Sequence, residues 1–146
     1  MRPWFSLGPV GPLTSIGLLV LRVAMGIAFI LHGWPKIQQP FGWMPAEMNM
    51  PSYLQALAAF AEFGGGISLV LGLLTRFFAI GLAITMAVAA LEVHIPAGHP
   101  YVSMGGPSWE LAGVYFACAV LFLLSGPGRL SLDHMLFGRK PVHPAV

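Results

Sequence analysis

The stretch TSIGLLVLRVAMGIAFILHGW at residues 14–34 is almost entirely apolar. Arg22 is its only Lys, Arg, Asp or Glu residue. Crossing the roughly 30 Å hydrocarbon core of a bilayer takes about 20 such residues in a helix. The chain has 146 residues, 57% of them hydrophobic and 8% charged, whereas soluble domains carry about 25% charged residues. Further apolar stretches lie at residues 52–75, 77–94 and 109–124. The sequence therefore predicts a single transmembrane domain over residues 1–146.

The connections between these stretches indicate how the helices are arranged. The first helix should end at Trp34, because Pro35 begins a loop rich in proline and glycine. Ser52 and Gln55 have the spacing of a capping box and should start the second helix. The turn at residues 75–76 is so short that the second and third helices must form an antiparallel hairpin. We expect an all-α fold, a membrane four-helix bundle running up, down, up and down.

Lysine and arginine residues are distributed unevenly between the two expected membrane faces. The first loop has only Lys36 and the third loop has neither residue type. The N-terminus, second loop and tail together contain Arg2, Arg76, Arg129, Arg139 and Lys140. The positive-inside rule therefore places both termini in the cytoplasm. The formal charge of +2 comes from scattered basic residues rather than a block, so nucleic-acid binding is excluded.

Small residues predict how the helices pack. Gly64, Ser68 and Gly72 recur every fourth residue and should form one stripe against which another helix packs closely. Cys118, the only cysteine, lies in the fourth apolar stretch and should pack as a small hydrophobe. One cysteine cannot form an intrachain disulfide, which excludes a self-contained thiol relay.

The tail predicts a separate short element. A glycine-proline-glycine break at residues 126–128 should end the fourth helix, and mixed apolar and charged residues follow it. We expect a short amphipathic segment on the cytoplasmic membrane surface, with Arg129 near lipid phosphates. Two alternatives stay open: Asp133 pairs with Arg76 or Arg129, or the segment docks a partner protein.

Two ionisable side chains lie deep in the predicted membrane region. Such a group costs about 2.5 to 3.5 kcal/mol to insert, so it needs a partner, water or a function. At about 1.5 Å rise per residue, Arg22 and Glu62 fall at a similar depth. We expect them to form an interhelical ion pair, either as a structural clasp or as catalytic groups.

A second polar group should gather at the outer helix ends. There His32 and Lys36 are candidate substrate-binding residues, and His94 and Glu110 are candidate catalytic residues that exchange protons. The alternative is that His94 and Glu92 are merely interfacial. No spacing matches a di-metal or zinc motif, so we expect no bound metal, no haem and no covalently attached cofactor.

The order of these motifs resembles that of the DoxX family, four-helix membrane proteins of bacteria and archaea. The likeness covers about residues 16–133. The matching positions are Leu21-Arg22 through Gly26, His32-Gly33 with Lys36, Glu62-Phe63-Gly64-Gly65-Gly66, Gly72-Leu73-Leu74-Thr75-Arg76, Met86, His94, Glu110 and the closing GPGRLSLD at 126–133.

The resemblance implies a bacterial or archaeal inner-membrane protein linked to respiratory or sulfur metabolism. The family is named after a protein associated with a terminal quinol oxidase, and a related branch resembles membrane subunits of thiosulfate:quinone oxidoreductase. Quinone is therefore the candidate cofactor, held by the outer polar group. The alternatives are a non-catalytic anchor or accessory subunit, working with partner subunits or as a homo-oligomer in the lipid bilayer, and, third, a small-molecule transporter.

Overall fold

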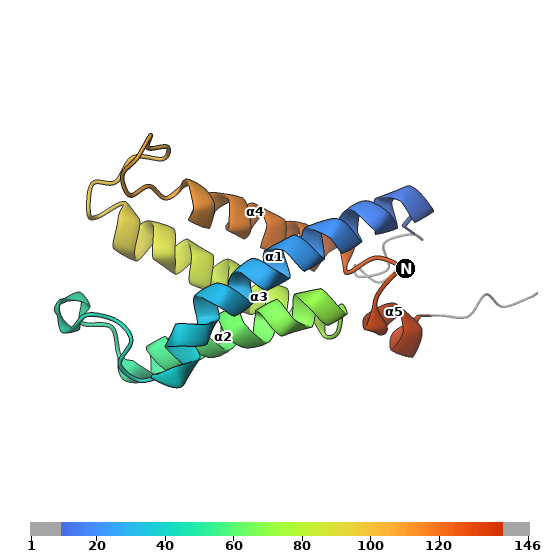
Figure 1. Cartoon of the computed structure of the whole chain (residues 1–146), viewed down its shortest axis with the longest axis horizontal. Coiled ribbons are helices and arrows are strands. Elements are labelled where there is room, and N and C mark those ends of the chain that lie inside the picture. Colours follow the sequence, from blue (N-terminus) through green and yellow to red (C-terminus); the bar gives the residue numbers. More distant parts are fainter. Residues whose placement is uncertain (1–9, 139–146) are drawn as a thin grey trace, which may run out of the picture.

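The computed structural model describes residues 10–138, and this part of the chain is helical with no strand. Four long helices form a bundle in which each helix contacts the next one along the chain. Figure 1 shows two long loops at one end of the bundle and the short helix α5 at the other. We call these the loop end (residues 39–51 and 95–109) and the α5 end. The elements are α1 (Pro12–Gln38), η1 (Ala46–Met48), α2 (Ser52–Leu71), α3 (Thr75–Val88), the π-helical η2 (Ala89–His94), α4 (Glu110–Ser125) and α5 (Leu132–Phe137).

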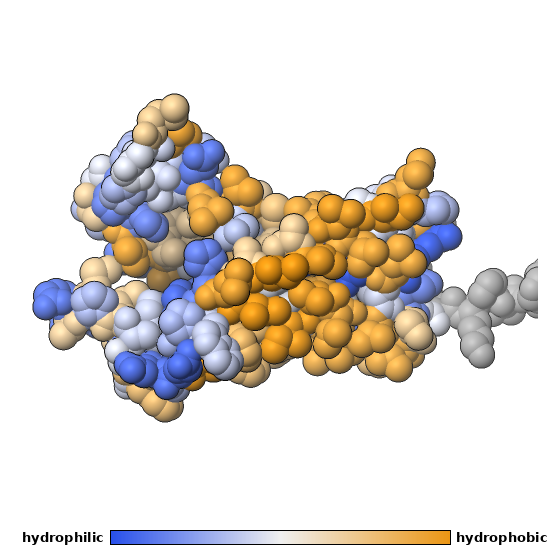
Figure 2. Space-filling view, viewed as in Figure 1, coloured by the Kyte–Doolittle hydropathy of each residue, from blue (hydrophilic) through white to orange (hydrophobic). Residues whose placement is uncertain are grey.

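The apolar helices make this chain a multi-pass membrane protein. By length and hydropathy, α1, α2 and the continuous α3–η2 helix can each cross a membrane, at 27, 20 and 20 residues. α4 has 16 residues, which gives about 24 Å of rise and makes it the shortest of the four. Figure 2 shows an apolar band between polar ends. The prediction of an all-α membrane bundle is confirmed.

The bounds of α1 and α2 differ from those predicted. α1 continues through Pro35 to Gln38, so Pro35, which has no backbone N–H to donate, lies inside the last turns of the helix instead of ending it. α2 stops at Leu71 rather than residue 75, because Gly72 takes a left-handed conformation with φ of 67°. The chain turns over residues 72–74, and Thr75 already begins α3.

The expected capping box at the start of α2 is wrong. Pro51 occupies the N-cap position and no side chain caps the helix. Gln55 turns toward the first loop, where its amide accepts from Met44 N at 3.1 Å and donates to Met50 O at 2.9 Å. The Gln55 amide therefore pairs with backbone groups of the loop and not with the N–H groups at the start of α2. Without Gln55 these loop groups would lie unpaired near the membrane, which is costly.

α1 and α2 approach each other at glycines. A Cβ on Gly26 would lie 2.8 Å from Gly66 O, and one on Gly33 would lie 2.6 Å from Phe63 N. The predicted stripe of Gly64, Ser68 and Gly72 is therefore wrong for two of its residues. Gly64 faces Phe78 of α3, and Gly72 lies beyond the end of α2.

The core lies between all four helices. Its buried side chains are Leu18, Met25, Phe29, Leu69, Ala79, Leu82, Met86, Ala90, Ala112, Ala119 and Phe122. The rings of Phe29 in α1 and Tyr115 in α4 lie 4.9 Å apart between centroids, which closes the bundle. Cys118 is half-buried and packs against this core, as predicted.

Residues 126–133, which we call the closing strap, tie the α5 end together. Arg129 N donates to Ser15 Oγ of α1 at 3.2 Å, and Asp133 N donates to Gly72 O at 2.8 Å. The Asp133 carboxylate accepts Leu74 N at 2.7 Å and Thr75 N at 2.9 Å. It thus caps the start of α3, where a negative charge is favourable.

The short amphipathic segment predicted for the tail forms the helix α5, whose first two residues, Leu132 and Asp133, are also the last two of the strap. Its exposed apolar residues are Met135, Leu136 and Phe137. The predicted roles of Arg2, Arg139 and Lys140 in orientation lie outside the described residues.

Candidate functional site

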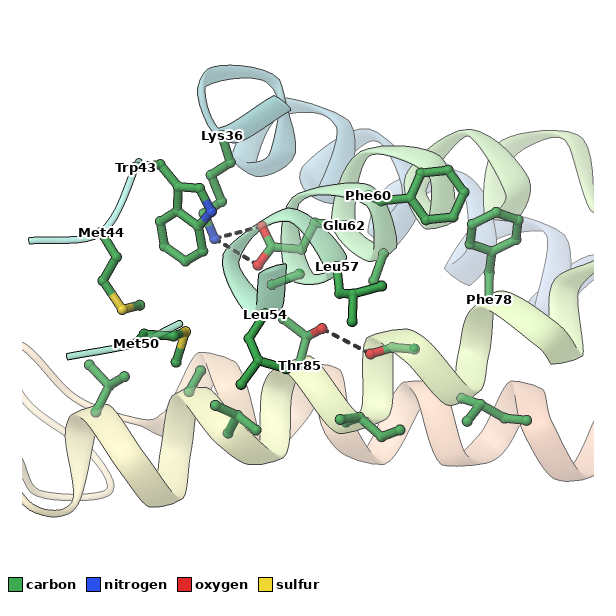
Figure 3. Close-up of a pocket in the computed structure, with 18 of the residues that line it drawn as sticks. Lys36, Trp43, Met44, Met50, Leu54, Leu57, Phe60, Glu62, Phe78 and Thr85 are labelled. Atoms are coloured by element: carbon green, nitrogen blue, oxygen red, sulfur yellow. Dashed lines mark hydrogen bonds and ion pairs between the residues drawn. The ribbon is translucent and has the colours of Figure 1, made fainter. Parts of the chain in front are cut away.

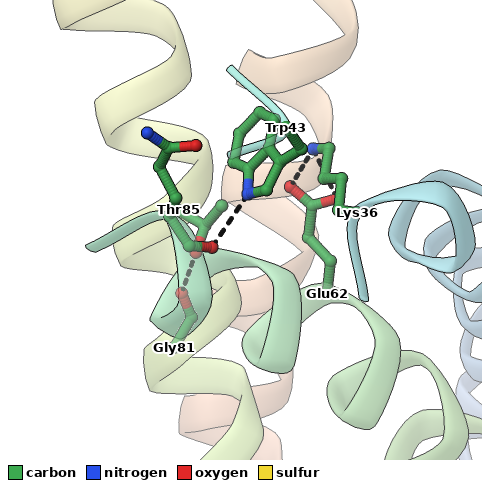
Figure 4. A network of polar contacts seen from close by, with 6 residues as sticks. Lys36, Trp43, Glu62, Gly81 and Thr85 are labelled. Carbon is green, nitrogen blue, oxygen red and sulfur yellow. Dashed lines mark hydrogen bonds and ion pairs between the residues drawn. The ribbon is translucent and has the colours of Figure 1, made fainter. Parts of the chain in front are cut away.

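An ion pair between α1 and α2 lies at the centre of the candidate site. Lys36 Nζ contacts both carboxylate oxygens of Glu62, at 2.6 and 2.7 Å (Figure 4). The Glu62 side chain is 3% exposed and that of Lys36 is 25% exposed. The pair is therefore screened from solvent on the α2 side and accessible on the α1 side.

Helix geometry explains why Lys36 reaches Glu62. Because Gly33 packs against Phe63, Glu62 lies at nearly the level of Gly33, one turn below Lys36. Side chains in a helix lean toward its N-terminus. Lys36 therefore leans into the membrane from the end of α1, and Glu62 leans out toward the loop end, so the two charges converge.

The predicted pair of Arg22 with Glu62 is wrong. Arg22 lies eleven residues before Gly33 in α1, or about 16 Å along the axis, and leans away toward the α5 end. Its guanidinium is buried at 1% exposure, donates to Leu69 O at 3.0 Å and also donates to Leu130 O. It thereby neutralises the carbonyl end of α2 and holds the closing strap.

The first loop covers the ion pair. The Trp43 ring lies 4.5 Å from Lys36 Nζ, measured to the ring centroid, and its indole Nε1 donates to Gln55 O at 2.9 Å. A cation over an indole face is stabilised by about 0.5 to 2 kcal/mol, more when water is excluded. Gln55 thus fixes both the indole and the neighbouring loop backbone, so that the loop is held over Lys36.

A cavity of about 610 Å³ runs from this ion pair along the groove between α2 and α3. Figure 3 shows Lys36, Glu62 and Trp43 at one end and the rings of Phe60 and Phe78 at the other. Most of the wall is apolar, and among its few polar side chains is Thr85, whose hydroxyl donates to Gly81 O at 2.9 Å. Further lining residues are Met44, Met50, Leu54, Leu57, Ile80, Ile84 and Val88.

The predicted polar cup does not form among the described residues. Lys36 is engaged with Glu62, while His32 and Glu110 are exposed and make no hydrogen bond or ion pair with the other members. His94 is half-buried and contacts His99, with 3.0 Å between their Nδ1 atoms. The positions of the helix ends predict such a cup. The four side chains point in different directions, however, and do not meet.

Two of the predicted site residues, Lys36 and Glu62, lie together in the candidate site, but they pair with each other rather than with Arg22 and the polar cup. Trp43, Gln55 and Thr85 were missed. A glutamine in an apolar helix window is a usable signal, because a buried amide must satisfy several hydrogen bonds. Nothing in the sequence indicates that Trp43 folds back over α1. No group of three or more metal-ligating side chains occurs within residues 10–138.

Comparison with known proteins gives a consistent result. The family model described as DoxX matches residues 17–95. The inner membrane protein YqjF of Escherichia coli is 33% identical over 85% of this chain and 95% of its own length. A Bacillus subtilis protein named "Putative oxidoreductase CatD" is 31% identical over 86% of this chain and 91% of its own. The inner membrane protein YphA of E. coli is 28% identical over 89% and 95%. No solved structure matches significantly.

Proposed function

This chain belongs to the DoxX family, and we propose that it binds the head group of a membrane quinone in the α2–α3 cavity as part of a respiratory or sulfur-linked redox system. The observation that carries the proposal is a largely apolar cavity that ends on an ion pair between the half-buried Lys36 and the buried Glu62. A quinone has the matching shape, since a flat ring with two carbonyl oxygens joins an apolar tail. Ligand sites of this kind combine apolar walls with a few fixed polar groups.

The polar end of the cavity offers a donor to a quinone carbonyl. An ammonium group has three N–H donors, and Glu62 takes two of those of Lys36. The third is available to an acceptor in the cavity. Trp43 offers a ring face beside the ammonium, so the head group can be held between a hydrogen bond and an aromatic surface.

In the proposed reaction this chain transfers protons and a partner subunit supplies electrons. Conversion of a quinone to a quinol adds two electrons and two protons. We assign the two electrons to a partner redox subunit and the two protons to water at the loop end, from which the Lys36–Glu62 pair transfers them one after the other to the bound ring. The name of the B. subtilis relative supports an oxidoreductase connection for that protein. In this proposal the present chain is the quinone-binding member of a larger assembly.

We also propose that the α5 end faces the cytoplasm. Arg76 and Arg129 lie at that end, around the strap and α5. At the loop end the positive charge of Lys36 is balanced by the carboxylate of Glu62. The positive-inside rule then orients the bundle. The quinone head group would consequently bind toward the outer face.

Quinone binding can be tested on the full chain by fluorescence, because a quinone bound beside Trp43 should quench its emission. Wild-type protein in detergent is titrated with a short-chain ubiquinone and with menadione. Trp43→Phe should abolish most of the saturable quenching. Glu62→Gln removes the carboxylate that holds the Lys36 ammonium in place, and it should weaken binding about tenfold, as expected when a charged hydrogen bond to the quinone is no longer held in position.

Two matched variants separate a site defect from a folding defect. Glu110→Gln makes the same chemical change at an exposed position outside the cavity and should leave binding unchanged. Ile80→Trp, on α3, fills part of the cavity while leaving both charged residues in place, and it should also weaken binding. Absence of saturable quenching in the wild type, or equal effects of Glu62→Gln and Glu110→Gln, would refute the proposal and leave the accessory-subunit alternative.

A further inference from the structure

A second cavity lies at the α5 end, at the other end of the bundle from the Lys36–Glu62 pair, and Phe77 lines both cavities. It has a volume of about 650 Å³ and is lined by the end of α4, the closing strap, the start of α3 and α5. The quinone proposal does not use it.

The charge around this second cavity is predominantly positive. The cationic side chains of Arg76 and Arg129 line it, and Asp133 is its one carboxylate among the described residues. Both oxygens of Asp133 accept backbone N–H groups at the start of α3. Its negative charge is therefore directed at the helix terminus rather than at the opening of the cavity.

The two arginines occupy different positions. Arg76 is half-buried, and its guanidinium donates to Leu124 O at 3.4 Å in the last turn of α4. Arg129 is exposed, and the strap fixes its backbone through the bond from its N–H to Ser15 Oγ. The strap thus holds a solvent-accessible guanidinium at the edge of the cavity.

Apolar side chains adjoin this basic cavity. Phe77, Leu74 and Phe137 contribute to its wall, and Met135 and Leu136 of α5 are exposed beside it at 77% and 64%. Figure 2 shows that apolar surface continues along the bundle from this end. An occupant with an anionic group and apolar chains would satisfy both kinds of surface.

We propose that the cavity at the α5 end is a binding site for an anionic phospholipid, with the phosphate beside Arg129 and Arg76 and the acyl chains along Phe137 and the bundle. Basic cavities at helix ends bind lipid head groups through charge-assisted hydrogen bonds to phosphate. Arg129 is the main contact because it is exposed. The lipid would add to the contacts that hold the strap and α5 against α3 and α4.

The test measures lipid binding to the full chain by native mass spectrometry from detergent micelles. The probes are dioctanoyl phosphatidylglycerol, dioctanoyl phosphatidylcholine and inorganic phosphate. We expect phosphatidylglycerol to bind about fivefold more tightly than phosphatidylcholine, the effect of roughly one extra charge contact. Inorganic phosphate should not compete at equal concentration, because it lacks the apolar chains.

Variants at one position give the decisive comparison. Arg129→Gln should reduce phosphatidylglycerol binding about fivefold, whereas Arg129→Lys should largely retain it. Glu110→Gln removes one exposed charge at the loop end, outside both cavities, and should not change it. Equal binding of the two lipids, equal effects of Arg129→Gln and Glu110→Gln, or full competition by inorganic phosphate would each overturn the proposal.

Discussion

Replacing Gly33 by alanine should separate α1 from α2 and disturb the ion pair above it. A Cβ at position 33 would lie 2.6 Å from the backbone nitrogen of Phe63, about 0.8 Å short of the 3.4 Å at which ordinary contacts begin. The next two atoms, Cα and Cβ of Phe63, are at 2.8 and 2.9 Å. Because two of the three opposing atoms belong to the backbone, a side-chain rotation cannot relieve the clash, and one helix must move.

The size of the effect follows from this geometry. Forcing one extra methyl into a closely packed contact typically costs about 1 to 3 kcal/mol. The upper half of that range applies here, because the displaced element is a helix that also carries Glu62. Close glycine contacts are a main source of helix association in membranes, so little else can compensate.

Thermal unfolding of purified protein in detergent measures the change. Gly17→Ala is the matched control, since it lies in the same helix and a Cβ there meets nothing within 4 Å. We expect a clear loss of thermal stability for Gly33→Ala and none for Gly17→Ala. Equal stability of the two variants would show that α1 and α2 do not meet at Gly33, and the register that places Lys36 above Glu62 would then be wrong.

Two further predictions concern the ion pair and the orientation. Lys36→Met and Glu62→Gln should each destabilise the protein by about 2 to 4 kcal/mol, because each strands the partner charge, and the double variant should lose less than the sum in the same unfolding assay; additive losses would mean that the two do not interact. A cysteine introduced at Gly98 in a Cys118→Ala background should react with an impermeant thiol reagent from outside intact cells. Labelling only after the cytoplasmic face is exposed would invert the proposed topology.

The partner of Glu62, predicted as Arg22 and found to be Lys36, shows what residue counting along the sequence cannot decide. Depth along a helix follows from residue counting, but counting needs a fixed point at each helix end. The proline at position 35 predicts that α1 ends at Trp34, whereas the helix runs on to Gln38. That shift, and the lean of side chains toward the helix N-terminus, exchanged Arg22 for Lys36 as the partner of Glu62.

The sequence by itself determined the membrane location, the all-helical fold, the helix order and a short amphipathic segment after the fourth helix, because apolar length and glycine or proline breaks are local properties of the chain. It also identified Glu62 as a functional candidate, since a charge in an apolar stretch is costly wherever it lies. Lys36 was a candidate because polar side chains were expected to gather at the outer helix ends. Only the tertiary structure decided which charges meet, that Trp43 covers them and that a cavity opens beside them. These features depend on the register between helices and on side-chain direction, both of which are set by long-range contacts such as that of Gly33 with Phe63.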